Sequence, residues 1–115
     1  MSQVFCYGML KNPLIWMLVT RTWPRVTSKA TLQGYKVVES GSKRVGNNLV
    51  PCEGSSVTGI LRPVRGCWVE LDNFEHRYTR APGTVSTPGG DVDAYYYLLS
   101  KPTIRTVNKE HVVCA

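Results

Sequence analysis

The stretch Val4-Phe5-Cys6-Tyr7-Gly8-Met9-Leu10 decides the fold of this chain, because an apolar run in it breaks on a glycine. The run before the glycine predicts a short buried strand over residues 3 to 7. Gly8 then lets the backbone turn, and a turn that leads from a strand into a helix points several unpaired N–H groups in one direction. Such amides can hold a carboxylate or a phosphate, although an ordinary turn without a ligand is the commoner alternative.

A helix is expected directly after this turn, over about residues 12 to 20. Pro13 fits its first turn, where a missing N–H loses no hydrogen bond. We expect the helix to bury Leu14, Met17 and Leu18 against a sheet, because their spacing places them on one face.

The second informative stretch is Glu70-Leu71-Asp72-Asn73-Phe74-Glu75. Trp68, Leu71 and Phe74 recur at helical spacing, which predicts a short helix over residues 67 to 75. The last residue of the stretch stands one helical turn after Leu71 and therefore lies near the same apolar face.

Glu75 is the candidate proton carrier of the chain. Burial beside large apolar side chains and the negative end of the helix both disfavour the ionised form, so we expect its pKa to be raised toward neutrality. A carboxyl group with such a pKa suits proton transfer at neutral pH. The alternative is a structural ion pair of Glu75 with Arg77 or Arg80.

The C-terminal half of the chain predicts strands joined by tight turns. Pro88-Gly89-Gly90-Asp91 lies between two β-rich runs, at residues 78 to 87 and 92 to 99, and is the strongest hairpin signal in the sequence. A further strand is expected at residues 57 to 64.

The middle and the end of the chain carry weaker signals. Residues 31 to 39 predict a strand in which Gly34 marks a bulge or a close backbone approach. Residues 40 to 54 are rich in Gly, Asn and Pro, so we expect a long loop there, with a short strand at 48 to 50. Residues 101 to 115 are expected to form a weakly specified tail.

The length and the cysteines of the chain limit the classes of protein to which it can belong. We expect a single domain over residues 1 to 115, large enough to bury a core. No apolar run approaches the ~20 residues that span a membrane, and no secretory signal is expected at the N-terminus. The four cysteines are scattered, without a C-x-x-C pair or a histidine at ligand spacing. This favours reduced thiols in the cytoplasm over a zinc site, with a disulfide as the alternative.

The chain is basic, with 14 Lys and Arg against 8 Asp and Glu and a net charge of +6. The positive residues are spread rather than gathered in a block, which is typical of a solvated surface. Attraction of an anionic small molecule or of RNA is the alternative.

Several short motifs follow one another in a characteristic order: Val-Phe-x-Tyr-Gly-x-Leu-Lys at residues 4 to 11, Leu32-x-Gly34-Tyr35, Pro51, Val57-x-Gly59-x-Leu61, Leu71-Asp72-x-Phe74-Glu75, Tyr78-x-Arg80 and a tyrosine-rich strand. In this combination the chain resembles the gamma-glutamylcyclotransferase-like superfamily, from about residue 4 to 99. The resemblance implies an α+β fold, namely a mixed, partly closed β-barrel with short flanking helices and a cavity at one end.

The resemblance also implies an activity. Members of this superfamily cyclise the gamma-glutamyl group of a gamma-glutamyl amine or peptide and release 5-oxoproline and the free amine. Glu75 would be the general acid and base of this reaction, which needs neither a metal nor another cofactor, and Tyr78 would line the cavity or bond Glu75. The loop expected to bind the small-molecule substrate through its amides consists of Tyr7, Gly8, Met9 and Leu10.

Three positions depart from the pattern of the superfamily. Met9 stands where threonine is usual, so a hydroxyl contact is lost while the backbone amide remains. His76 stands where a glycine commonly follows the glutamate. The segment Pro13-Leu14-Ile15-Trp16 replaces the usual Asn-His after the glycine loop.

Two other classes of function compete with the enzyme. The first is a binding module for a small molecule or a protein, which keeps the fold and the cavity without turnover. The second is a basic RNA-binding β-domain, which the net charge and the tyrosines favour and the spread of the arginines and lysines opposes. Neither a membrane nor a nucleic acid is the expected partner.

Overall fold

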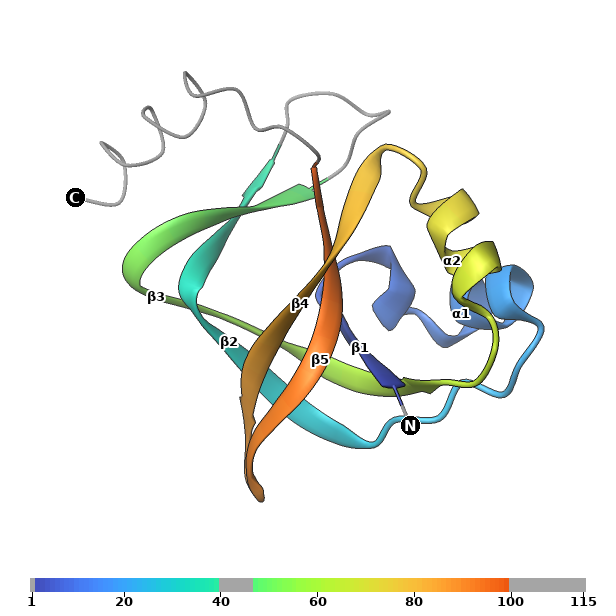
Figure 1. Cartoon of the computed structure of the whole chain (residues 1–115), viewed down its shortest axis with the longest axis horizontal. Helices are drawn as coiled ribbons and strands as arrows, with labels where there is room; N and C mark the ends of the chain where they lie inside the picture. Colours follow the sequence, from blue (N-terminus) through green and yellow to red (C-terminus); the bar gives the residue numbers. More distant parts are fainter. Residues whose placement is uncertain (1, 40–46, 100–115) are drawn as a thin grey trace.

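The apolar run at the N-terminus forms strand β1 (Ser2–Cys6) in the computed structural model, which describes residues 2–39 and 47–99 (Figure 1). The strand therefore begins and ends one residue earlier than predicted. Neighbouring side chains of β1 point to opposite faces, as in any strand: Phe5 enters one core cluster, while Val4 and Cys6 enter another. Burial on both faces explains why the whole run is apolar.

Five strands and three short helical segments make up the described chain. After β1 come the 3-10 helix η1 (Met9–Lys11), helix α1 (Pro13–Thr20), β2 (Ser28–Glu39), β3 (Asn47–Val64), helix α2 (Trp68–Phe74), β4 (Tyr78–Thr87) and β5 (Gly90–Leu99). Both predicted helices and the predicted hairpin are confirmed.

The strands form a ring in the order β1-β3-β2-β4-β5, with helices α1 and α2 on one side of it (Figure 1). The pairs β1–β3, β2–β3 and β4–β5 are long and antiparallel. Two seams are narrow: β2 pairs with β4 at Thr31 and Ser86, and β1 pairs in parallel with β5 at Val4 and Tyr95. The expected α+β fold, a mixed and partly closed barrel with short flanking helices, is confirmed.

Strand β3 replaces much of the loop that the sequence predicts. From Asn47 onward the chain continues as a strand up to Val64 and pairs with β2. The predicted short strand at residues 48 to 50 is therefore confirmed, and the predicted loop is wrong at residue 47 and over residues 51 to 54. Pairing with a long neighbour overrides the turn-forming residues here. The other part of that prediction, at residues 40 to 46, and the tail prediction at residues 101 to 115 lie outside the described residues.

Glycines allow these two long strands to bend without breaking their pairing. Gly34 adopts a φ of 83° where the register shifts between Gln33 and Tyr35, so the predicted bulge is confirmed. Gly54 has a φ of 86° in β3. Both values lie in the left-handed region, which glycine enters without steric cost.

Helix α1 buries a different face from the predicted one. Leu14 and Leu18 are 65% and 77% exposed, whereas Trp16 and Thr20 are buried. The indole of Trp16 packs in the core beneath the helix, and the Thr20 hydroxyl bonds its carbonyl at 2.8 Å. Residues four apart lie on one face of a helix, and this holds for Leu14 and Leu18 as well as for Trp16 and Thr20. The face with the larger, aromatic side chain is the buried one.

Two core clusters lie on either side of the barrel wall. The cluster inside the ring contains Phe5, Leu49, Leu61 and Val85, among others. The second lies between the wall and the helices and includes Val4, Cys6, Leu10, Trp16, Val64, Leu71 and Tyr97. The wall strands β1 and β3 contribute to both clusters.

Three of the cysteines lie in the described part of the chain. Cys6 and Cys67 are free and buried, in line with the expected reduced thiols. Cys52 is disulfide-bonded, so that expectation is wrong at this position. No helix within the described ranges is long and apolar enough to span a membrane, and residues 2–39 and 47–99 hold no group of three potential metal-binding side chains.

Candidate functional site

The two informative segments of the sequence meet at one end of the wall beside the helices. Tyr7 and Gly8 follow directly after β1 and lead into η1. Glu75 ends α2 as its C-cap residue, and its own carbonyl accepts a 2.7 Å hydrogen bond from the N–H of Tyr78, the first residue of β4. The glutamate therefore stands in a tight connection between a helix and a strand.

The turn after β1 presents three backbone N–H groups. Its own hydrogen bonds join the N–H of Lys11 to the carbonyl of Gly8 and the N–H of Asn12 to the carbonyl of Met9, each at 3.0 Å. Within the described residues, the N–H groups of Gly8, Met9 and Leu10 have no backbone partner. A side chain added at Gly8 would meet no atom within 4 Å, so the space beside the turn is open.

The N-terminus of α1 does not take part in this group of amides. The side chain of Asn12 caps the helix and accepts hydrogen bonds from the N–H groups of Leu14 at 2.9 Å and Ile15 at 3.4 Å. The protein itself thus satisfies this helix end. The unpaired N–H groups of this segment are therefore those of the turn, residues 8 to 10, rather than those of the helix that follows.

Met9 and Leu10 contribute to this turn in different ways. The Leu10 side chain is buried in the core below the helices, so only its backbone faces the site. Met9 is 61% exposed. Its side chain therefore does not fill the core.

The carboxyl group of Glu75 is half-buried, and this burial raises its pKa from 4.5 to about 7. The expected direction of the shift is confirmed, and of its two expected causes burial accounts for it. A carboxyl group with this pKa exchanges its proton readily near neutral pH.

Tyr7 and Tyr78 share the environment of Glu75. Burial is the main cause of the raised pKa of both phenols, and the charge of the Glu75 carboxylate raises each pKa further. The same charge adds to the raised pKa of the buried Cys6 thiol, at the end of β1. These electrostatic effects indicate that the glutamate lies near the segment in which the glycine turn begins.

The hydroxyl of Tyr7 donates a short hydrogen bond to the carbonyl of Tyr97 on β5. This bond anchors the first residue of the turn to the neighbouring strand. The side chain of Tyr97 continues the connection, since its hydroxyl donates to the Asp72 carboxylate at 2.7 Å and thereby ties β5 to α2.

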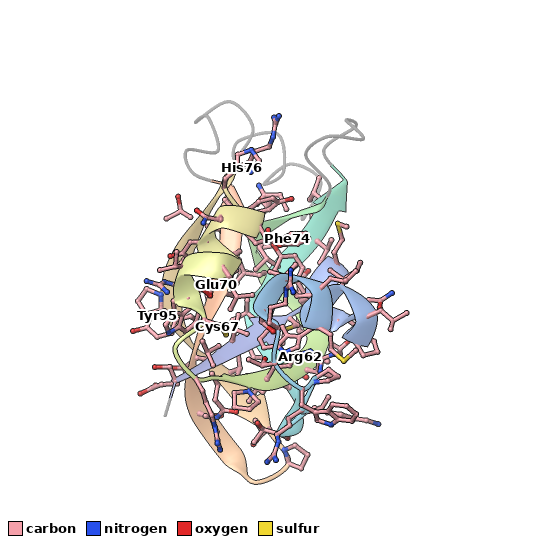
Figure 2. The ribbon with its side chains drawn as sticks, turned by 90° about the vertical axis from the view of Figure 1, so that its right-hand side faces the viewer. Arg62, Cys67, Glu70, Phe74, His76 and Tyr95 are labelled. Carbon is pink, nitrogen blue, oxygen red and sulfur yellow. The ribbon has the colours of Figure 1, made fainter. Side chains whose placement is uncertain are left out.

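The alternative role for Glu75, an ion pair with Arg80, does not agree with the structure. Among the described residues, Arg80 pairs with Asp72 at 3.7 Å, and its guanidinium carbon stacks 4.3 Å from the centre of the Trp68 ring. Arg77 and His76 are exposed, and His76 lies at the outer end of α2 (Figure 2).

Sequence reasoning missed three residues that hold the site together. Asp72 and Tyr97 connect α2 to β5, and Arg62 lies buried behind the glycine turn. A signal for Arg62 was present, because a single arginine interrupts the apolar run Ile60–Val64 in a predicted strand. No comparable signal marks Tyr97 among its two neighbouring tyrosines.

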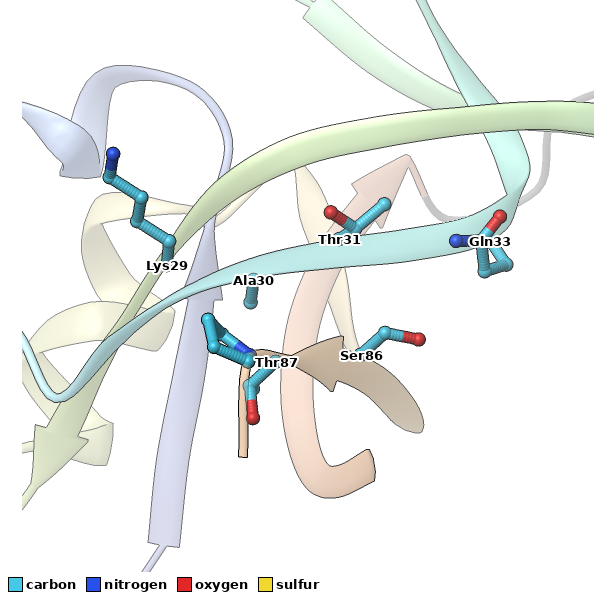
Figure 3. Close-up of a pocket in the computed structure, with 7 residues that line it drawn as sticks. Lys29, Ala30, Thr31, Gln33, Ser86 and Thr87 are labelled. Carbon is cyan, nitrogen blue, oxygen red and sulfur yellow. The ribbon is translucent and has the colours of Figure 1, made fainter. Parts of the chain in front are cut away.

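A separate surface pocket lies across the narrow seam between β2 and β4 (Figure 3). Its volume is about 290 Å³. The residues that line it are Lys29, Ala30, Thr31, Gln33, Ser86, Thr87 and Pro88. They include no carboxyl or imidazole group, so this pocket offers no general base and shares no residue with the predicted site.

Solved structures of other proteins share this fold. A structure described as gamma-glutamyl cyclotransferase superposes with a TM-score of 0.74 at 18% identity, covering 86% of this chain and 66% of its own. An uncharacterized protein from Homo sapiens gives 0.73 at 19% identity, with 87% and 67% covered. YkqA from Bacillus subtilis gives 0.72 at 17% identity, with 86% and 40% covered. At such low identities the likeness shows the fold, and the chain spans only part of each of these proteins.

Sequence comparison shows the family directly. No curated protein sequence matches the chain. The model of the family described as "Gamma-glutamyl cyclotransferase, AIG2-like" matches residues 4–113, which is nearly the whole sequence. Because this match covers well over half of the sequence, the chain belongs to the AIG2-like gamma-glutamyl cyclotransferase family.

Proposed function

We propose that this protein is a cyclotransferase that converts a gamma-glutamyl amine or peptide into 5-oxoproline and a free amine. The observation that carries the proposal is the half-buried Glu75, whose pKa of about 7 and position beside Tyr7 suit a proton carrier next to an anion-binding turn. Membership of the family supports the reaction class.

The reaction needs one proton carrier. Glu75 accepts a proton from the α-amino nitrogen of the substrate, and this nitrogen attacks the δ-carbonyl carbon of the same molecule. A new C–N bond closes the five-membered ring while the C–N bond to the leaving amine breaks. Glu75 returns its proton to the leaving nitrogen, so atoms and charges balance and the carboxylate is regenerated. Holding both reacting groups in one molecule removes most of the entropic cost of the attack.

The glycine turn would hold the substrate in place. The free N–H groups of Gly8, Met9 and Leu10 suit the α-carboxylate of a gamma-glutamyl compound, because several amides that converge on one anion bind it well. Tyr7 shapes this turn through its bond to β5, and Tyr78 lines the site on the side of Glu75.

Replacing Glu75 by Gln tests the proposal. We expect 5-oxoproline release from a panel of gamma-glutamyl amines and peptides to fall about 100-fold or more, while the protein stays folded. Glu70→Gln is the matched control, because it removes an exposed carboxylate in the first turn of the same helix. Full activity of Glu75→Gln would refute the assignment of the general base.

The binding module without turnover makes a different prediction. In that case the wild type binds 5-oxoproline or a gamma-glutamyl amine but releases no product from any member of the panel. The cytoplasmic location also stays a prediction, and counting free thiols in protein taken from its native cell tests it.

A further inference from the structure

Arg62 of β3 is among the most buried side chains of the protein, at 2% exposure (Figure 2). Its guanidinium group donates four hydrogen bonds to backbone carbonyls. Nε bonds Leu10 at 3.1 Å and Nη2 bonds Lys11 at 2.7 Å. Nη1 bonds Pro24 at 2.9 Å and Arg25 at 3.3 Å.

These carbonyls belong to two segments on either side of α1. The carbonyls of Leu10 and Lys11 lie at the end of the glycine turn, before α1. The carbonyls of Pro24 and Arg25 lie in the segment that follows α1. The ring of Trp16, from the helix itself, lies 5.5 Å from the guanidinium carbon. Arg62 therefore fastens both ends of the turn-and-helix segment to the barrel wall.

The charge of Arg62 has no carboxylate partner among the described residues. Its four hydrogen bonds to the backbone go to neutral carbonyl oxygens. A buried charge is costly unless it is paired or hydrogen-bonded, and here the carbonyl oxygens of the two segments supply the hydrogen bonds. Its field reaches the end of β1: burial raises the pKa of Cys6 to about 12, and the charge and a hydrogen bond of Arg62 oppose that rise.

We propose that Arg62 is a positioning residue for the anion-binding turn. It fixes the end of the turn, so that the free N–H groups of Gly8, Met9 and Leu10 keep one direction, and it adds positive potential behind them. This inference rests on the proposed function in that it takes the turn as the site for the substrate carboxylate.

Binding of 5-oxoproline to three variants tests the inference. Arg62→Gln removes both the charge and the forked donors, and we expect about tenfold weaker binding in a calorimetric titration. Arg62→Lys keeps the positive charge but lacks the planar set of guanidinium donors, so its affinity should lie between those of the wild type and Arg62→Gln. Arg65→Gln is the matched control, because it removes an exposed arginine directly after the end of β3. This variant should bind 5-oxoproline like the wild type.

Amide hydrogen exchange gives a second readout that needs no ligand. The N–H groups of Lys11 and Asn12 close the turn, and we expect them to exchange about tenfold faster in both Arg62 variants. The amides that join β1 to β3 should keep their protection, which separates a loosened turn from a destabilised fold.

The outcomes separate the inference from the proposed function. If the wild type does not bind 5-oxoproline, the proposed function fails, and the exchange rates still decide whether Arg62 holds the turn. If Arg62→Gln folds and both its affinity and its turn exchange match the wild type, the inference is wrong. If Arg62→Gln does not fold, Arg62→Lys decides by the same two measurements.

Discussion

At the scale of single residues, the chemistry of the site depends on where a carboxyl group is placed rather than on a cluster of reactive groups. Glu75 ends a seven-residue helix and is half-buried, and burial alone accounts for its raised pKa. The neighbouring carboxylate Asp72, one turn earlier, is instead bonded by Tyr97 and paired with Arg80. Asp72 thus has a structural role, whereas Glu75 is the proposed proton carrier.

The raised pKa of Glu75 predicts a pH-dependent stability. Between about pH 4.5 and 7 the folded chain keeps a proton that the unfolded chain has lost, so the free energy of unfolding falls as pH rises through this interval. Glu75→Gln lacks this loss. We expect the variant to be more stable than the wild type by about 1–2 kcal/mol near pH 8, after allowance for solvent screening, and the gap to close near pH 5. Urea unfolding at both pH values measures it, and an equal pH dependence of the two proteins would contradict it.

Gly8→Ala tests whether the open space beside the glycine turn is the place where the ligand binds. The added methyl group would meet no atom within 4 Å, so no steric clash opposes the folding of this variant, and thermal unfolding checks that it stays folded. The methyl group would stand beside the free amides of the turn and hinder an anion there. We expect about tenfold weaker binding of 5-oxoproline, measured by calorimetry. Unchanged affinity would place the ligand elsewhere.

Patterns in the sequence identified the candidate site better than they identified the packing around it. Glu75 could be found because its neighbours recur at helical spacing, and Gly8 because it ends an apolar run. The exposed positions of Leu14 and Leu18 could not be found, since the buried face of α1 depends on Arg62 and on barrel strands distant in sequence.

At the scale of elements, a close contact between two strands fixes the turn that carries the site. Gly59 of β3 lies against the end of β1, where an added Cβ would stand 2.3 Å from the carbonyl oxygen of Cys6 and 2.9 Å from the Phe5 ring. Only a residue without a side chain lets the two strands approach this closely. The same approach places Tyr7, the next residue after β1, beside β5.

Gly59→Ala should therefore destabilise the protein. The methyl group must push backbone atoms of β1, which cannot rotate away, and we expect a loss of about 1–3 kcal/mol in urea unfolding. Gly89→Ala in the β4–β5 turn is the control, because its Cβ would meet only the Thr87 hydroxyl at 3.9 Å. Its effect should stay within about 0.5 kcal/mol. Equal stabilities of Gly59→Ala and Gly89→Ala would show that β1 can move away from the added methyl group without a loss of stability.

The same elements show why the sequence predicted β3 only in part. Its second half alternates and contains branched residues, whereas its first half carries Pro51 and Gly54, which are typical of turns. The pairing of Asn47–Pro51 with Tyr35–Glu39 holds this first half in the sheet. Such pairing is a property of two segments together, and neither segment alone reveals it.

At the scale of the whole molecule, β3 joins the two cores. Leu61 packs inside the ring, and Val64, three residues later, packs beneath the helices. Strand β1 divides its side chains between the same two clusters. The site lies on the helix side, yet the strand that holds Arg62 behind it is also the longest wall of the barrel.

The two cores should consequently unfold together. Trp16 reports on the core beneath the helices through its fluorescence, and far-UV circular dichroism reports mainly on the strands of the ring. We expect both signals to give the same urea midpoint, because losing either core removes the packing of β1 and β3 that the other needs. Trp23→Phe removes an exposed indole and sharpens the first signal without touching either core. An earlier midpoint by fluorescence would mean that α1 and the glycine turn open while the barrel stays intact, and the site would then be a separately stable unit.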